Sequence, residues 1–521
     1  MRRALLLAFL LLPDSATGCA RTLPPLPQVT LAVDTDLPVD RLAVQLRLDV
    51  YLEDGTWIES REAPRADPRG WPATFTVFAP DDRPRSVLVR LRAYPRGLVR
   101  DYRGERFEER PGPLPAAEVI PLPAATDLPR LLVDGVDVTP RSEPIPTVTV
   151  DHLSRVALGS EGATAHVVLR AACAGTMVDL TNATTCVDGA RVAAGSDGGP
   201  PTSTSRVGTA FGPAPCTETP RPPHAAKDGT PLLDEEVCVD GGTFVLGDPI
   251  LGNVGLIDGR DVSTNPPRLA HVPALRVDRY EFTVARYREA LAAGFVVDDE
   301  TDLPIPNDKP LPLAPTEDPI EQCTFSTAPL PGDASREAFA LNCLPWHTAR
   351  ALCRFSGGDL LTEAHYEWVA SAAGRPRKTP YPWGTAPPRC DRQVYGRERD
   401  PVVGGTECIQ KPWSKPYTPG PVTEGPGDET PILGNGLSIH GLGGGQPEFS
   451  RDVFQPFRSR CWLSQPIHDP TCGAGDTSRH TSRGGGWGFQ PFLMLSTARL
   501  PLGGLVIATD VSFRCMRKGA P

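Results

Sequence analysis

The chain has 521 residues, of which 40% are hydrophobic and 22% are charged, and its formal net charge is −10. This length allows two or three domains, and the acidic balance argues against nucleic acid as a partner, because that binding depends on Lys and Arg displacing counterions. The 60 prolines and 50 glycines predict many loops and few long helices.

The N-terminus has the pattern of an export signal. A basic start at residues 1–3 precedes the apolar residues 4–12, a run shorter than the roughly 20 residues of a membrane span. Its end, Ala16-Thr17-Gly18-Cys19, resembles the lipobox of bacterial lipoproteins, in which the cysteine carries the lipid. We therefore predict a signal peptide at residues 1–18, a lipid on Cys19 and a tether at residues 19–28. The lipid would anchor the protein in the cell envelope, at the outer membrane or the periplasmic face.

Residues 29–187 contain short apolar runs separated by Pro, Asp, Gly and Arg. In one run Val87, Val89 and Leu91 occupy alternate positions, which is the period of a strand. Runs of this length and spacing predict an antiparallel, immunoglobulin-like all-β sandwich. No cluster in this region suits acid-base or metal chemistry, so we interpret it as a spacer or an interaction module.

Residues 188–231 are rich in Pro, Gly, Ser and Thr and predict a linker. After it, residues 232–521 predict an α+β domain rich in irregular loops, so the chain is expected to be multidomain. Thr283 and Thr362 are good N-caps for two helices of this domain, and another helix is expected at residues 346–355.

Cysteine usage supports export. There are 13 cysteines, and reserving Cys19 for lipid leaves twelve, enough for six disulfides in an oxidising compartment. Short separations favour two pairs, Cys173 with Cys186 and Cys343 with Cys353. The connectivity of the others stays open, and no spacing matches a CxxC metal motif.

Several segments, in order, resemble the formylglycine-generating enzyme, or sulfatase-modifying-factor, family. The most specific reads Leu-Leu-Thr-Glu-Ala-His-Tyr-Glu-Trp and is followed by Tyr-Pro-Trp-Gly. The resemblance implies an α+β fold that is related to the C-type lectin fold and has little regular secondary structure. The segments are residues 238–247, 271–283, 344–353, 360–370, 381–384, 483–487, 498–499 and 512–514.

The resemblance also identifies what is missing. Active members place two cysteines after an Arg-Gly-Gly turn, where they bind copper and oxidise a substrate cysteine. In SRGGGWGFQPFLMLSTARL, residues 482–500, these positions fall on Phe489 and Met494, and no cysteine lies between Cys472 and Cys515. Thiolate is both the soft copper ligand and the redox group, so we do not expect the parent reaction, although other catalysis stays open.

The family's calcium-supporting segment appears as Gly444-Gly-Gln-Pro-Glu-Phe449. Glu448 is an oxygen ligand of the kind that calcium prefers, but Gly441 replaces the asparagine expected before it. Two interpretations follow: Glu448 binds calcium, or it is a structural carboxylate.

Two main functional hypotheses remain. In the first, the domain is non-catalytic and binds a peptide, a glycan or another envelope ligand in a groove. In the second, it is a divergent metal-dependent oxidase, of the formylglycine-generating or non-haem iron type, with ligands such as His440 and His480. A passive structural role is a third option, and core packing is an alternative for Trp487. The predicted groove residues are Trp487, Phe489, Phe492, Arg499 and His440.

Overall fold

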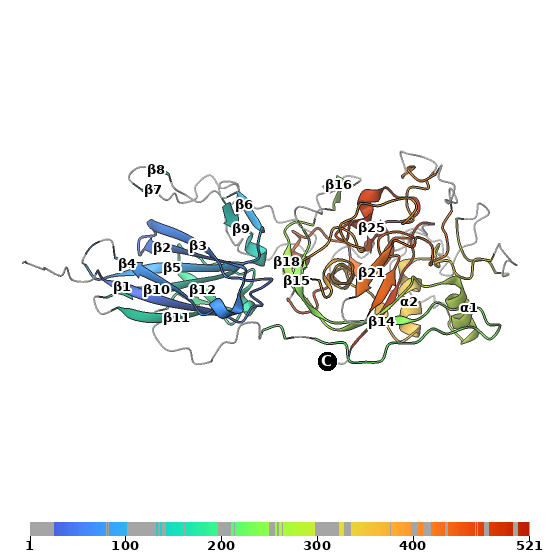
Figure 1. Ribbon diagram of the computed structural model, residues 1–521, viewed down its shortest axis with the longest axis horizontal. Coiled ribbons are helices and arrows are strands. Elements are labelled where there is room, and N and C mark those ends of the chain that lie inside the picture. The colour runs from blue at the N-terminus through green and yellow to red at the C-terminus, as the bar shows by residue number, and fades with distance from the viewer. Residues whose placement is uncertain are drawn as a thin grey trace, which may run out of the picture.

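The computed structural model forms two lobes, one coloured blue to teal and one green to red (Figure 1). The predicted signal peptide, Cys19 and most of the predicted tether lie outside the described residues. The structure describes residues 26–519 except 80, 82, 102–131, 134–135, 138–141, 160–161, 196–209, 213, 249–255, 258–259, 263, 297–321, 328–334, 376, 399–404, 410–417, 433–435, 464, 466, 474–478 and 504–508.

The first lobe is a two-layer β-sandwich. One sheet has the strand order β11-β1-β4 and the other β10-β5-β2-β3. The strands are β1 (Gln28–Thr35), β2 (Gln45–Leu52), β3 (Trp57–Pro64), β4 (Ala73–Phe78), β5 (Arg85–Tyr94), β10 (Val150–Leu158) and β11 (Ala163–Leu169).

Alternate residues of these strands fill the space between the sheets. Val29, Leu31 and Val33 of β1 are at most 2% exposed and belong to the same core as Leu48 of β2. The predicted sandwich is therefore confirmed. One pairing departs from the antiparallel prediction, because β1 runs parallel to β11.

A hairpin and a charge network cover the outer face of the four-stranded sheet. The hairpin consists of β12 (Thr184–Val187) and β13 (Ala190–Ala193), and the disulfide Cys173–Cys186 ties it down, as predicted. Under it, Arg90 pairs with Asp151 at 2.7 Å. Buried carboxylates thus compensate the buried guanidinium groups of this face.

Short elements complete the lobe. β6 (Val99–Asp101) pairs with β9 (Ser142–Pro144), and β7 (Leu132–Val133) pairs with β8 (Val136–Asp137). The 3-10 turns are η1 (Pro68–Gly70), η2 (Pro146–Val148) and η3 (Ala171–Cys173).

The described part of the predicted linker carries more structure than expected. Its first residues form β13, and Phe211 packs into the core of the sandwich. Cys216 is bonded to Cys238, and Arg221 pairs with Asp278 at 2.5 Å. Disulfide and ion pair thus fix this stretch to the second lobe, upstream of the predicted domain start at residue 232.

The second lobe contains several small sheets. A four-stranded sheet has the order β14-β19-β26-β20, and a three-stranded sheet has the order β23-β24-β25. Pairs β15-β18, β16-β17 and β21-β22 surround them. The strands are β14 (Glu236–Val239), β15 (Gly242–Leu246), β16 (Leu256–Ile257), β17 (Arg260–Asp261), β18 (Arg268–Val272), β19 (Leu275–Asp278), β20 (Asp359–Leu360), β21 (Glu429–Ile432), β22 (Leu437–His440), β23 (Glu448–Val453), β24 (Arg479–Arg483), β25 (Arg499–Gly503) and β26 (Cys515–Lys518).

The predicted helices of this lobe are confirmed. Thr283 caps α1 (Val284–Ala292) by accepting from the backbone N–H of Arg286, and α2 spans Trp346–Phe355. Thr362 caps α3 (Glu363–Glu367) in a capping box with His365. The π-helical turn η5 (Trp368–Ala372), α4 (Arg460–Leu463) and the 3-10 turn η6 (Pro491–Met494) complete the set.

The disulfides correct one prediction. Cys343 bonds Cys323, and Cys353 bonds Cys515, so the predicted pair Cys343–Cys353 is wrong. The physical reason is α2, which begins at Trp346: the helical rise from there to Cys353 is about 10 Å, more than the roughly 7 Å that a disulfide bridges. The other bonds are Cys390–Cys408 and Cys461–Cys472.

The two lobes meet at β18 and β15, which face the sandwich (Figure 1). Phe211 stacks on His271 with ring centroids 5.5 Å apart, and His468 lies 5.0 Å from His271. Thr147 donates its hydroxyl proton to the carbonyl of Pro267. Leu269 of β18 extends the sandwich core into the second lobe.

Candidate functional site

The candidate site is built on two glycine-rich segments that are hydrogen-bonded to each other. The Arg-Gly-Gly-Gly turn lies on the loop at residues 441–445, because Gly485 N–H donates to the carbonyl of Gly443 at 2.9 Å. A Cβ on Gly485 would stand 2.8 Å from Met494 Cγ, and Gly484 has a φ of +84°. Glycine is therefore required here by close approach and by backbone conformation.

Two buried carboxylates from other parts of the chain accept hydrogen bonds from the backbone of this loop and of the residue after it. Glu281 Oε1 accepts from Gln446 N–H at 3.0 Å, and Asp428 Oδ2 accepts from Gly444 N–H at 2.5 Å. Burial, followed by the charge of Glu448, raises the pKa of Glu281 well above its usual value. Burial likewise raises the pKa of Asp428.

A cavity of about 10 Å³ opens between these groups, room for about one water-sized group. Glu281, Asp428 and Gln446 line it together with Gly441 and Gly445. The amide oxygen and nitrogen of Gln446 are buried and have no hydrogen-bond partner in the structure. A buried amide of this kind normally has a hydrogen-bond partner, and the cavity has room for one water-sized polar group.

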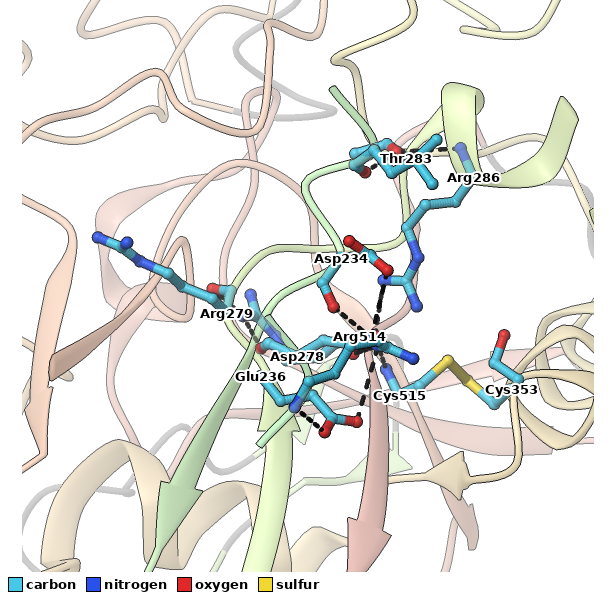
Figure 2. A network of polar contacts seen from close by, with 12 residues as sticks. Asp234, Glu236, Asp278, Arg279, Thr283, Arg286, Cys353, Arg514 and Cys515 are labelled. Carbon is cyan, nitrogen blue, oxygen red and sulfur yellow. Dashed lines mark hydrogen bonds and ion pairs between the residues drawn. A yellow bond between two sulfur atoms is a disulfide. The ribbon is translucent and has the colours of Figure 1, made fainter. Parts of the chain in front are cut away.

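Arg514 organises the other side of the loop (Figure 2). Its guanidinium donates to Glu448 Oε1 at 2.7 and 2.9 Å and to the carbonyls of Asp278, Arg279 and His440 at 2.9, 2.7 and 2.8 Å. Glu448 is thus compensated by a resident cation. This arrangement favours the structural interpretation of Glu448 over its predicted role as a calcium ligand.

Figure 2 shows that the same network includes Asp278, the last residue of β19 in the four-stranded sheet. Asp278 Oδ2 accepts from Arg286 at 2.7 Å and from the backbone N–H of Cys515 at 3.2 Å. Cys515 in turn is bonded to Cys353 of α2. The position of Arg514 is therefore fixed from several directions.

His440 does not have the free nitrogen of a metal ligand. Its Nε2 faces the carbonyl of Glu424 at 2.9 Å, and its Nδ1 faces Glu429 Oε1 at 3.1 Å. Both ring nitrogens are thus engaged with oxygen acceptors, and only 3% of the residue is exposed. The predictions that His440 lines a groove or binds a metal are not supported by this geometry.

Two of the predicted groove residues are buried in the core. Trp487 is 1% exposed and Arg499 is 2% exposed. Arg499 pairs with Glu363 at 2.5 Å, and its guanidinium lies 4.2 Å from the ring of Phe457. They therefore stabilise the scaffold, which is the packing alternative, and do not form a surface for a ligand.

Phe489 and Phe492 lie nearer the surface. Phe492 of η6 is 37% exposed, and Phe489 is half-buried against the small core of Leu493, Ala498 and Leu500. Met494, at the second position expected for a cysteine, is fully buried beside Tyr395. All twelve cysteines of the described residues are in disulfides, so that part of the chain offers no thiolate.

Two further aromatic residues adjoin this region and were missed as site residues by sequence reasoning. Tyr381 and Trp383 stack with ring centroids 5.0 Å apart and planes 4° apart, and both are half-buried. They pack against the cluster that contains Met494. The signal was present in the Tyr-Pro-Trp-Gly segment, whose aromatic residues flank a proline, but only the fold places it beside η6.

Metal and membrane features were also searched among the described residues. They contain no group of three His, Cys, Asp or Glu side chains placed to hold a metal ion. Nor does any helix among them have the length and apolar character to cross a membrane. The six disulfides fit an exported protein.

Comparison with solved structures finds proteins of low sequence identity to this chain. The chain is similar to PvdO from Pseudomonas aeruginosa, with 17% identity, a TM-score of 0.38 and coverage of 58% of this chain and 100% of that one. It is also similar to Treponema denticola variable protein 1, with 12% identity, a TM-score of 0.31 and coverage of 57% and 99%. CarF gives 12% identity, a TM-score of 0.30 and coverage of 54% and 98%.

No curated protein matches the chain. The model of the sulfatase-modifying factor enzyme 1-like domain matches residues 222–519, more than half of the chain, and begins ten residues before the predicted domain start. The chain therefore belongs to the family of proteins that carry this domain.

Proposed function

We propose that this chain is an exported, lipid-anchored protein whose C-terminal domain binds a peptide or glycan of the cell envelope and does not form formylglycine. The observation that carries the proposal is that Met494 is fully buried and Phe489 is half-buried, at the two positions where the family resemblance places cysteines. The paired state of the described cysteines also supports it, because copper chemistry in this family needs thiolate.

The ligand surface we propose consists of Tyr381, Trp383, Phe489 and Phe492. This surface differs from the groove predicted from the sequence, because Trp487 and Arg499 are left out. Both are buried and therefore cannot contact a ligand. Aromatic rings give large contact area to sugar rings or apolar peptide side chains at low entropic cost. The parallel planes of Tyr381 and Trp383 make this part of the surface flat and rigid.

The test is binding of the natively exported protein to a glycan array and an envelope peptide library. We expect saturable binding that Phe492→Ala and Trp383→Ala weaken at least tenfold. The matched control is Phe78→Ala. Phe78 is 51% exposed, but it lies in β4 of the sandwich and is not part of the proposed ligand surface. Absence of saturable binding, or equal binding by all variants, would contradict the proposal.

The anchor is tested separately on the same material. Intact mass of the exported protein is expected to include a diacylglycerol on Cys19, which Cys19→Ser abolishes along with membrane association. A non-lipidated mature N-terminus would refute the anchor and leave the ligand-binding proposal standing.

Calcium, which the family resemblance implies, is proposed as a structural ion with a donor set that differs from the one predicted. Glu281, Asp428 and Gln446 would hold it, because their oxygens line a polar cavity and the Gln446 amide has no other partner. Its contribution would be to neutralise two buried carboxylates. We leave Glu448 out of the proposed set because it pairs with Arg514 at 2.7 Å.

A further inference from the structure

The contact between the two lobes contains a cluster of three aromatic rings. Phe211, which packs in the core of the sandwich, stacks on His271 of β18 with ring centroids 5.5 Å apart and planes 23° apart. The ring of His468 lies 5.0 Å from that of His271 and 5.5 Å from that of Phe211. One ring of the cluster thus packs with the sandwich, and the two ionisable rings belong to the second lobe.

The position of His271 in β18 turns its side chain toward the sandwich. Alternate residues of a strand share one face, so His271 lies on the same face as Leu269, which belongs to the sandwich core. Ala270 and Val272, on the other face, belong to the core of the second lobe. Thr243 of β15 is the cross-strand neighbour of His271, and its Oγ1 lies 2.8 Å from His271 Nδ1. The imidazole is therefore held at the boundary between the lobes.

The backbone holds His468 beside this strand. The N–H of His271 donates to the carbonyl of Ile467 at 2.8 Å, and the N–H of Asp469 donates to the carbonyl of His271 at 2.8 Å. His468 and His271 are thus paired as a parallel bridge. This pairing keeps the two imidazoles side by side.

The charged groups around His271 give a positive charge little compensation. The carboxylate that acts on this ring is that of Asp469, which also binds His365 at 2.6 Å and pairs with Lys518. Arg268 lies on the same strand and adds a positive charge. Burial, followed by the charge of His468, lowers the pKa of His271 below its usual value although Asp469 opposes the shift.

The other elements that pack on β18 supply no free carboxylate to this ring. β15 reads Gly-Thr-Phe-Val-Leu and η2 reads Pro-Thr-Val, so neither contains an ionisable side chain. α3 contains Glu363 and Glu367, which are paired with Arg499 at 2.5 Å and with Arg483 at 2.6 Å. A proton on His271 would therefore face His468 with Asp469 as its main counter-charge.

The direction of the pH effect follows from the burial of His271. Separation of the lobes would expose this ring and return its pKa to about 6.5. The separated state would then bind the proton more tightly than the docked state, so docking weakens as the pH falls below about 6.5. When His468 is also charged, two like charges lie 5.0 Å apart and weaken the docked state further.

The connection between the lobes limits how far they can separate. Phe211 is held in the sandwich core, and Cys216 is bonded to Cys238 in the second lobe. The five residue steps from 211 to 216 span at most about 18 Å. Loss of the contact would therefore let the lobes pivot about this connection while they stay close together.

We propose that the cluster of Phe211, His271 and His468 is a pH-sensitive contact that holds the lobes together at neutral pH and releases them below about pH 6. The hydrogen bond from Thr147 to Pro267 and the packing of Leu269 cross the same boundary, and both are uncharged. Acid would thus free the lobe that carries the candidate site from the sandwich. This inference depends neither on the proposed ligand nor on the lipid anchor.

The experiment is hydroxyl-radical footprinting and small-angle scattering of the full-length exported protein at about pH 7.5 and about pH 5. Phe211 is 9% exposed, so its oxidation rate should rise at least threefold in acid, together with the radius of gyration. Leu31, in the middle of the sandwich core and 0% exposed, is the internal reference and should stay protected at both pH values.

Three variants assign the effect. His271→Phe keeps a ring against Phe211 and does not titrate, so it should stay docked in acid. His468→Gln changes an exposed residue and should reduce the acid response at least twofold. His224→Gln is the matched control, because His224 pairs with Asp234 in the second lobe and lies outside the cluster, so this variant should respond as the parent does.

An oxidation rate of Phe211 and a radius of gyration that stay constant between the two pH values in the parent protein would overturn the proposal. An equal acid response in His271→Phe and the parent would overturn it as well, because another group would then be responsible. Where His271→Phe does not fold, His468→Gln decides, and a response equal to that of the parent counts against the cluster.

Discussion

Arg499 and Glu363 form an ion pair in which neither side chain is exposed to solvent. Two hydrogen bonds of 2.8 and 2.5 Å join them, although 136 residues separate them in the sequence. Arg483 approaches the same carboxylate at 3.5 Å and pairs with Glu367 at 2.6 Å. The first turn of α3 and the start of β25 are thus joined by charges that water does not reach.

Arg499→Ala is expected to lower the free energy of unfolding by about 3–5 kcal/mol, because it leaves the carboxylate of Glu363 buried with a weaker partner. Hydrogen exchange of the β24 and β25 amides measures the loss in the domain concerned. Arg155→Ala is the control, since Arg155 and Glu53 form an exposed pair of 43% and 41% side-chain exposure. A similar loss in both variants would contradict the role of burial.

Removal of the Cys353–Cys515 bond should cost more than removal of Cys461–Cys472. The first closes a separation of 162 residues and the second one of 11. Loop-closure entropy then gives about 5 and about 3 kcal/mol for the two bonds. Denaturant unfolding of the two double Cys→Ala variants tests the order, and the reverse order would count against the chain-entropy explanation.

Calcium is expected to raise the melting temperature of the second lobe. At a hundred times its dissociation constant the ion would add about 2.7 kcal/mol to the free energy of unfolding. Glu281→Gln should remove this gain, whereas Glu53→Gln on the sandwich should keep it. If Glu281→Gln still responds to calcium as the parent does, the proposed donor set is wrong.

His365 gives the second lobe a defined pH dependence. Its Nδ1 accepts from Thr362 N–H at 3.3 Å, its Nε2 faces Asp469 at 2.6 Å, and burial lowers its pKa despite that carboxylate. The unfolded chain binds a proton below about pH 6.5 and the folded chain does not, so the free energy of unfolding falls as pH falls, by up to about 1.4 kcal/mol per pH unit.

His365→Gln tests this contribution, because Gln at the same position preserves a capping box with Thr362 and does not titrate. Unfolding between pH 6.5 and 5 should then depend less on pH than in the parent protein. An unchanged slope would mean that another group titrates in this range.

The sequence predicted the features that local chemistry determines. The caps at Thr283 and Thr362 are confirmed because a cap needs only its own first turn, and the alternation of Val87, Val89 and Leu91 is confirmed because all three face the sandwich core. The family assignment is confirmed because its motifs are short and ordered.

Features that depend on distant contacts were not accessible to the same reasoning. Arg499 looks like a ligand-binding residue until its partner is known, and that partner lies on another element. Cys343 and Cys353 are close in sequence, yet the rise of α2 separates them. The stacking of Trp346 on His480 depends likewise on a helix and a strand that are far apart in the chain.

The position of β26 has a consequence for biosynthesis. This strand lies between β19 and β20 in its sheet. The two strands therefore have no common neighbour until residues 515–518 have been synthesised and have paired with them. Until then Cys353 has no partner and the carbonyls around Arg514 have no donor. The four-stranded sheet of this domain therefore cannot be completed while the chain is being made, and it closes only when the strand at residues 515–518 pairs with β19 and β20.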